Sequence, residues 1–139
     1  MSLTASDLVS AAETRIPKVI DARTHGIIDY CHAAFFLTLG FASLKSNKRA
    51  AAASLFTGSF VLVQSLLTDY PLGVKPVLSF EEHGRLDALF ASASWAMPIL
   101  FGFSDTAQAH VFEGNSLVEA TAVALTDFNS ARARDEERD

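Results

Sequence analysis

The sequence is poor in charge, in cysteine and in the basic clusters that bind nucleic acid. Asp, Glu, Lys and Arg together make up 19% of the 139 residues, and the formal net charge is −5. Without a basic stripe the chain cannot neutralise phosphates along a nucleic acid, so we expect no nucleic-acid partner. Cys31 is the only cysteine, which excludes an intrachain disulfide. Residues 1–20 lack the basic start and the continuous apolar run of a signal peptide.

Recognisable catalytic patterns are missing as well. The sequence has no nucleophile triad, no glycine-rich phosphate loop and no cysteine-based site. We therefore expect a non-enzymatic protein with no catalytic residues. We also expect no cofactor, with a metal ion left open as an alternative that is taken up below.

Apolar surface, by contrast, is abundant. Half of the residues are apolar, and 11 of them are Phe. Three segments carry apolar stretches of about 18–20 residues, the length that crosses ~30 Å of hydrocarbon. Helices that are apolar on every side are either buried or in lipid, and so short a chain cannot bury three of them. We expect a multi-pass membrane protein in contact with lipids; the alternative is a soluble four-helix bundle that binds an apolar ligand.

Capping residues and prolines predict four helices. Asp21 opens the first, which runs to about residue 44, and the second covers residues 50–70 and stops before Pro71. Ser79 and Glu82 form a capping box that opens a third helix, over residues 80–103 with Pro98 inside it; Asp105 and Gln108 suggest a second box, which opens the fourth. More Lys and Arg lie on the side of the termini than in the loop at 45–49, so we expect both termini in the cytoplasm.

The two halves of the chain repeat each other at a fixed offset of 58 residues. His-Gly-x-[Ile/Leu]-Asp occurs at 25–29 and again at 83–87 (83 − 25 = 58), and Leu-Thr-Asp-[Tyr/Phe] occurs at 67–70 and 125–128 (125 − 67 = 58). Such self-similarity indicates a duplicated unit. We predict an all-α, four-helix transmembrane bundle made of two repeated hairpins, divided into a short amphipathic N-terminal helix (1–17), the first hairpin (18–70), a linker with the second hairpin (71–128) and a charged tail (129–139).

The duplication predicts one cluster of ionisable side chains. Two antiparallel hairpins place the starts of the first and third helices and the ends of the second and fourth at one level. The residues expected there are His25, Asp29, Asp69, His83, Asp87 and Asp127. Our preferred interpretation is a structural clasp between the hairpins. The alternative is a metal or proton site, because imidazole and carboxylate together suit Zn, Fe or Mn and because ionisable groups in membrane spans are functional candidates.

Other polar residues in the apolar segments permit further interpretations. His32 follows Asp29 by three residues and could bind a haem iron, although a lone histidine among apolar residues is more often a core residue. Glu113 and Glu119 interrupt the fourth segment. They could relay protons, face headgroups or face a partner subunit, and we favour the last two.

Several landmarks together resemble the small bacterial SPW-repeat membrane proteins. These are the segment from His25 to Tyr30, the Leu66–Tyr70 segment before the proline linker, His83 with Asp87, and the helix end at 98–103. The Ser-Pro-Trp tripeptide that names the family reads Met-Pro-Ile at 97–99 and is replaced by Thr-Leu-Gly at 38–40. The resemblance implies a four-span inner-membrane protein with no catalytic residues to transfer. We expect an accessory or structural subunit of a homo-oligomer or of a larger membrane complex.

Overall fold

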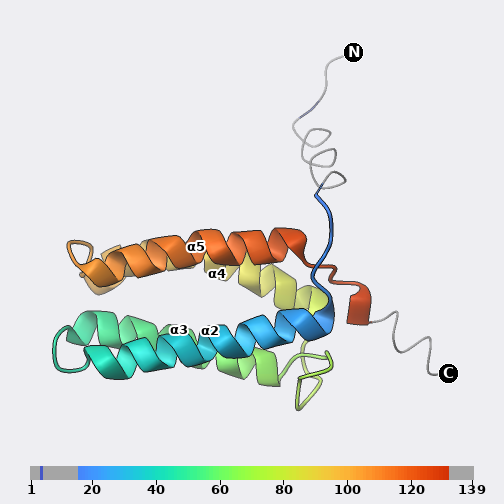
Figure 1. Cartoon of the computed structure of the whole chain (residues 1–139), viewed down its shortest axis with the longest axis horizontal. Helices are drawn as coiled ribbons and strands as arrows, with labels where there is room; N and C mark the ends of the chain where they lie inside the picture. The colour runs from blue at the N-terminus through green and yellow to red at the C-terminus, as the bar shows by residue number, and fades with distance from the viewer. Residues whose placement is uncertain (1–3, 5–15, 132–139) are drawn as a thin grey trace.

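In the computed structural model, which describes Thr4 and residues 16–131, the chain folds into an elongated bundle of α-helices (Figure 1). The helices in this part are α2 (Ala22–Ser43), α3 (Lys48–Leu66), α4 (Phe80–Phe101) and α5 (Ala107–Leu125). α2 and α3 form one antiparallel hairpin, and α4 and α5 form the other. This confirms the all-α four-helix bundle. The predicted N-terminal helix (1–17) and the charged tail (129–139) lie almost entirely outside the described residues.

Two of the predicted helix starts are confirmed, and one is wrong. The Asp21 side chain accepts a hydrogen bond from the Thr24 amide at 2.8 Å, and Ser79 and Glu82 form a reciprocal capping box. α5, however, begins after Thr106 without any side-chain cap, so the capping box predicted at Asp105 is not formed. The hydroxyl of Thr106 donates to the carbonyl of Phe103 instead, at 2.7 Å.

The second helix is shorter than predicted. α3 ends at Leu66 rather than at residue 70, because the chain leaves the helix to pair with the linker that follows. The amide of Asp69 donates to the carbonyl of Leu78 at 2.7 Å, and the amide of Leu78 donates to the carbonyl of Leu67 at 2.9 Å. The resulting short parallel bridge joins Thr68 to Leu78.

A second bridge repeats this pairing one duplication later. Ile20 pairs with Thr126, and the amide of Asp127 donates to the carbonyl of Ile20 at 2.8 Å. Adding 58 to Ile20 and to Thr68 gives Leu78 and Thr126, so the two bridges are equivalent. The beginning of each repeat is thus tied to the end of the other. Both bridges lie at the end of the bundle where the described chain enters and leaves (Figure 1).

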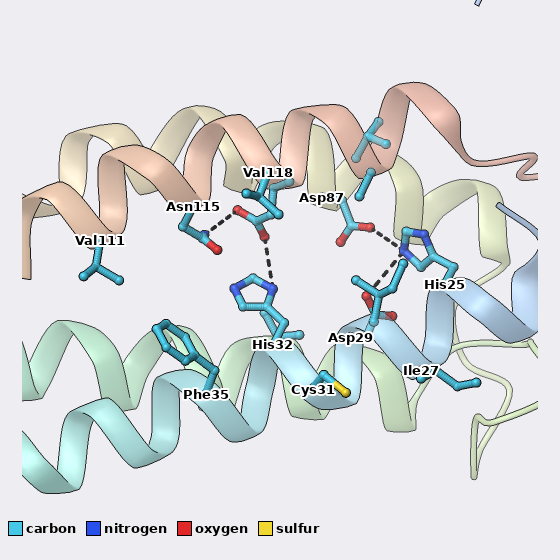
Figure 2. A pocket seen from close by; sticks show the side chains of 15 residues that line it. His25, Ile27, Asp29, Cys31, His32, Phe35, Asp87, Val111, Asn115 and Val118 are labelled. Atoms are coloured by element: carbon cyan, nitrogen blue, oxygen red, sulfur yellow. Dashed lines mark hydrogen bonds and ion pairs between the residues drawn. The ribbon is translucent and has the colours of Figure 1, made fainter. Parts of the chain in front are cut away.

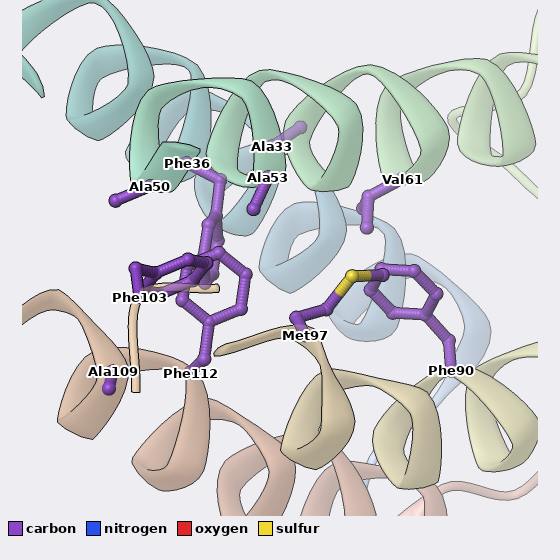
Figure 3. Packing of buried hydrophobic residues seen from close by; sticks show 10 residues of the cluster. All are labelled: Ala33, Phe36, Ala50, Ala53, Val61, Phe90, Met97, Phe103, Ala109 and Phe112. Carbon is purple, nitrogen blue, oxygen red and sulfur yellow. The ribbon is translucent and has the colours of Figure 1, made fainter. Parts of the chain in front are cut away.

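The apolar core lies between the hairpins in the middle and at the far end of the bundle (Figure 3). Phe36 and Phe112 are fully buried, with ring centroids 5.0 Å apart. Phe103 and Met97 fill the space beside them, and Phe90 packs farther along. Beyond this core, His25, Asp29, His83 and Asp87 lie together at the end that carries the bridges.

The outer surface is unusually apolar. Large apolar side chains on all four helices are more than half exposed: Phe35, Phe41, Phe56, Val63, Leu89, Trp95, Ile99, Leu100, Leu117 and Val118. Within the described residues, α2 alone combines the length and the hydropathy expected of a membrane span. The predicted crossing by all four helices is therefore supported in this one helix only.

Candidate metal centre

Four of the six predicted site residues meet at the end of the bundle that carries the bridges. His25 and Asp29 come from the first two turns of α2, and His83 and Asp87 come from the same turns of α4. One donor atom from each of the four lies within 4.8 Å of the others. Both histidines are almost fully buried, with exposed fractions of 2% and 1%. The duplication thus brings two His-x-x-x-Asp pairs face to face.

The spacing of these donor atoms is that of a metal coordination shell. The Nε2 atoms of His25 and His83 are 3.3 Å apart, and Oδ2 of Asp87 lies 3.1 Å from each of them. Oδ1 of Asp29 is 3.4 Å from His25 Nε2, and Oδ2 of Asp29 is 3.3 Å from His83 Nε2. A tetrahedral ion with ligands at about 2.0–2.1 Å separates neighbouring ligand atoms by about 3.3–3.4 Å. These five separations of 3.1–3.4 Å are close to that value, and donor atoms of all four residues lie within 4.8 Å of one another.

A threonine fixes the tautomer of His25. The hydroxyl of Thr126 donates its proton to the carbonyl of Ala122 at 2.6 Å, as a threonine at the end of a helix often does. The same oxygen lies 2.9 Å from Nδ1 of His25 and must therefore accept a hydrogen bond there. Nδ1 of His25 consequently carries a proton. In the neutral ring, Nε2 then presents a lone pair to the cluster.

His83 is held in the same way one repeat earlier. Thr68 donates to the carbonyl of Gln64 at 2.7 Å and accepts from Nδ1 of His83, also at 2.7 Å. Metal-binding histidines typically donate their second N–H to such an outer partner, which sets the tautomer and the ring orientation. Two lone pairs and two carboxylates therefore face one small space. Such electron-rich atoms repel each other unless protons or a metal ion lie between them.

Each carboxylate also has a hydrogen-bond donor outside the cluster, and the two donors differ. The hydroxyl of Tyr70 donates to Oδ2 of Asp29 at 3.1 Å, whereas Nε2 of Gln64 donates to Oδ1 of Asp87 at 2.6 Å. These donors have no counterpart in the other repeat, because Tyr70 corresponds to Phe128 and Gln64 to Ala122 (70 + 58 and 64 + 58). Both carboxylates are therefore oriented, each by its own partner.

The glycine that follows each histidine makes room for an aromatic ring. A Cβ added at Gly26 would lie 3.0 Å from the Tyr70 ring, and one added at Gly84 would lie 2.5 Å from the Phe128 ring. Both glycines therefore lie against side-chain rings from the end of a repeat. Together with Phe80, these rings cover the outer side of the histidines and limit the access of water.

Asp69 and Asp127 are not part of the cluster, so the prediction for these two residues is wrong. Asp69 is exposed, and the Asp127 carboxylate accepts from the amide of Asn129 at 3.0 Å. The preceding residues, Thr68 and Thr126, contact the histidines in their place. The signal for the threonines was present in the repeated Leu-Thr-Asp segment, but sequence analysis considered only its charged member.

The remaining polar candidates divide between the interior and the surface. Nδ1 of His32 lies 3.7 Å from Oε1 of Glu119, and Asn115 donates to Oε2 of Glu119 at 3.0 Å, in a groove between α2 and α5 (Figure 2). Glu113 instead contacts the exposed His110, at 3.0 Å. Sequence analysis singled out both glutamates but missed Asn115 and the pairing of Glu119 with His32.

The His25–Asp29–His83–Asp87 cluster fits a metal ion by its donor set. Two imidazole nitrogens and two carboxylate oxygens suit Zn²⁺, which binds such ligands in tetrahedral geometry. Four protein ligands with oriented outer partners are typical of a structural site rather than an open catalytic one. A comparison of the chain with protein-family models, with curated proteins and with solved structures found no match.

Proposed function

We propose that this protein is a small membrane protein whose two repeated hairpins are joined by a divalent transition-metal ion, with Zn²⁺ as the preferred ion. The observation that carries the proposal is the orientation of His25 and His83. Each Nδ1 faces a threonine oxygen that already donates its own proton elsewhere, so Nδ1 carries a proton and, in the neutral rings, both Nε2 lone pairs point at the same space. The carboxylates of Asp29 and Asp87 border this space at 3.1–3.4 Å from the nitrogens.

Charge balance supports the same conclusion. Two buried carboxylates bring two negative charges, and an unpaired buried charge costs several kcal/mol. Either two imidazolium ions or one divalent cation can neutralise them. The imidazolium form would hold two positive rings with their nitrogens 3.3 Å apart. A divalent ion supplies the same charge from one point between the four donors, and it uses the lone pairs as they are oriented.

The proposed role is structural, which unites the clasp and the metal site. An ion held by α2 and α4 ties the two hairpins together at the end where the bridges also cross between repeats. Because the ligands are not assembled in the unfolded chain, metal binding contributes directly to folding. We expect no catalytic role, since all four positions are filled by protein ligands.

The metal test compares four aspartates that the structure separates into two classes. The full chain is purified in mild detergent without chelators, and its zinc content is measured by mass spectrometry. We expect about one zinc per chain in the wild type, and loss of most of it in Asp29→Asn and Asp87→Asn. Asp69→Asn and Asp127→Asn are matched controls, because these carboxylates lie outside the cluster, and both should retain zinc. Wild-type protein that contains no metal and takes none up would contradict the proposal.

Membrane insertion is the second part of the proposal. It is supported by the apolar outer surface, by the hydropathy of α2 and by helices of 19–22 residues, which span about 30 Å at 1.5 Å per residue. The resemblance to SPW-repeat proteins agrees with it. We infer a multi-pass protein of the inner membrane with both termini in the cytoplasm. Expressed protein that is released from membranes by alkaline carbonate would instead favour the soluble bundle.

An accessory-subunit role is compatible with the metal clasp, and one observation favours it. α5 buries only Ala109 and Phe112, while Leu117 and Val118 on the same helix are about two-thirds exposed. Such a face can contact lipid, a second copy of the chain or another membrane subunit. The size and the protein composition of the detergent-solubilised particle distinguish these cases. A monomer with which no other protein co-purifies would argue against the subunit role.

A further inference from the structure

A groove between α2 and α5 has features that the metal clasp does not explain. It has a volume of about 510 Å³ and extends from the metal cluster toward the middle of the bundle (Figure 2). Its walls are largely apolar and include Ile28, Phe35, Val111 and Val118. Three polar side chains reach into it beyond the cluster: His32, Asn115 and Glu119. The volume is in the range that small-molecule sites occupy.

The duplication shows that these polar residues are not needed to build the fold. One repeat away, His32 corresponds to Phe90, Glu119 to Val61 and Asn115 to Thr57 (32 + 58, 61 + 58 and 57 + 58). In that half of the bundle, Phe90 stacks on Phe60 at 4.7 Å and belongs to the core. Two of the equivalent positions are thus apolar on one side, where a smaller hollow of about 390 Å³ between α3 and α4 remains, and hold a histidine and a glutamate on the other.

The carboxylate of Glu119 is nearly buried without a cationic partner at hydrogen-bonding distance. Its side chain is 11% exposed, and in the described part of the chain no lysine or arginine forms an ion pair with it. Asn115 donates to Oε2, but the 3.7 Å between Oε1 and Nδ1 of His32 exceeds a hydrogen bond. A buried carboxylate in this state is costly, and the cost is relieved either by a proton or by a positive charge that enters the groove.

His32 lies beside this carboxylate without forming a hydrogen bond to it. Its Nδ1 atom faces Glu119, and its Nε2 atom is buried on the other side of the ring with no hydrogen-bond partner. The groove therefore offers a carboxylate among largely apolar walls. These features suit a ligand that combines a positive charge with an apolar body.

We propose that the α2/α5 groove binds a lipophilic organic cation, such as an amine with an aromatic or alkyl body. The ammonium group pairs with the Glu119 carboxylate. The apolar body lies against Phe35 and Val118, and the Phe35 ring can also attract the cation through its face. Glu119, Phe35 and Val118 are not proposed metal ligands, so the proposal does not depend on a bound metal, although the metal cluster borders the same groove.

The test measures binding of dansylcadaverine, a fluorescent primary amine with an aromatic body, to the full chain in neutral detergent. The dansyl emission should shift to the blue and saturate with the wild type. Its N-acetylated analogue, which has the same body without the charge, should bind at least tenfold more weakly. Glu119→Gln keeps the size of the side chain and removes its charge, so it should also weaken binding at least tenfold. Glu113→Gln, on the exposed side of the same helix, is the matched control and should bind like the wild type.

Any of three results would overturn the proposal. The first is equal binding of the amine and its acetylated analogue to the wild type, which shows that the groove or the detergent binds the dansyl group alone. This comparison does not depend on the folding of any variant. The second is unchanged binding by Glu119→Gln when its helical circular dichroism and zinc content equal those of the wild type. Wild-type protein that shows no saturable shift also contradicts the proposal.

Discussion

Thr68 permits the most direct test of the reasoning about histidine tautomers. Its hydroxyl accepts from Nδ1 of His83 at 2.7 Å and donates to the carbonyl of Gln64. Thr68→Val retains the shape but removes the acceptor, which leaves the Nδ1–H of a buried ring unsatisfied at a cost of about 1–3 kcal/mol. The ring then gains by moving its proton to Nε2, where the proton blocks the metal-binding lone pair. We expect zinc affinity to fall.

The size of this effect follows from the position of Thr68, which touches a ligand and not the ion. Removing an outer partner of a metal ligand typically costs 10–100-fold in affinity, or about 1.4–2.8 kcal/mol. Affinity is measured by competition with a chromophoric zinc chelator in detergent. Thr68→Ser keeps the acceptor and should stay close to the wild type. The equivalent change at the other histidine, Thr126→Val, should have an effect similar to that of Thr68→Val.

A second buried threonine provides the matched control. Thr57 lies inside α3, is fully buried, and its hydroxyl has no hydrogen-bond partner. Thr57→Val therefore removes an unsatisfied polar group, and it should leave zinc affinity unchanged and stability equal or higher. If Thr68→Val binds zinc within twofold of the wild type, or if Thr57→Val loses as much affinity, the assignment of the histidine protons is refuted.

Three further predictions concern the same end of the bundle. Gly84→Ala places a Cβ against the Phe128 ring and should lower the melting temperature. In the control Gly114→Ala, the added Cβ meets nothing within 4 Å, so this variant should raise helix stability by about 0.5–1 kcal/mol. Thermal unfolding followed by circular dichroism compares the two variants. Chelation should lower the wild-type melting temperature because it removes the bound metal. Acidification should also lower it, because the ligands bind metal only when deprotonated. Both treatments should have little effect on Asp87→Asn. Tyr70→Phe copies the side chain at 128 and removes the donor to Asp29, so zinc affinity in the chelator assay should fall by up to 100-fold while the bundle stays folded.

The part of the fold that sequence analysis predicted well depends on local chemistry and on the repeat. Asp21 and Ser79 open helices because their side chains satisfy amides that have no partner within the helix. The 58-residue offset identified His25, Asp29, His83 and Asp87 as equivalent pairs, and two antiparallel hairpins must bring equivalent positions to one end. Neither inference required knowledge of how side chains pack between the hairpins.

The errors arise where the chain departs from regular helix or where two helices far apart in the sequence meet. Asp69 was expected to point at the histidines because the helix was extended through residue 70. The chain leaves the helix at Leu66 for the bridge to Leu78, which turns Thr68 inward and Asp69 toward solvent. The groove was missed for a different reason. Its polar contact joins His32 to Glu119, and no local pattern indicates which helix lies opposite α2.

The two repeats contribute equally to the His/Asp cluster but differ in the grooves between the hairpins. The metal cluster needs both copies, since each contributes one histidine and one aspartate, and a change in either copy would break it. The two inter-hairpin grooves are separate, so each copy can change alone. One is smaller and has the stacked rings of Phe60 and Phe90 beside it, and the other contains Glu119 and His32. The clasp needs matching residues in both copies, whereas a groove does not. A duplicated bundle can therefore combine a stable frame with a ligand site in one of its two grooves.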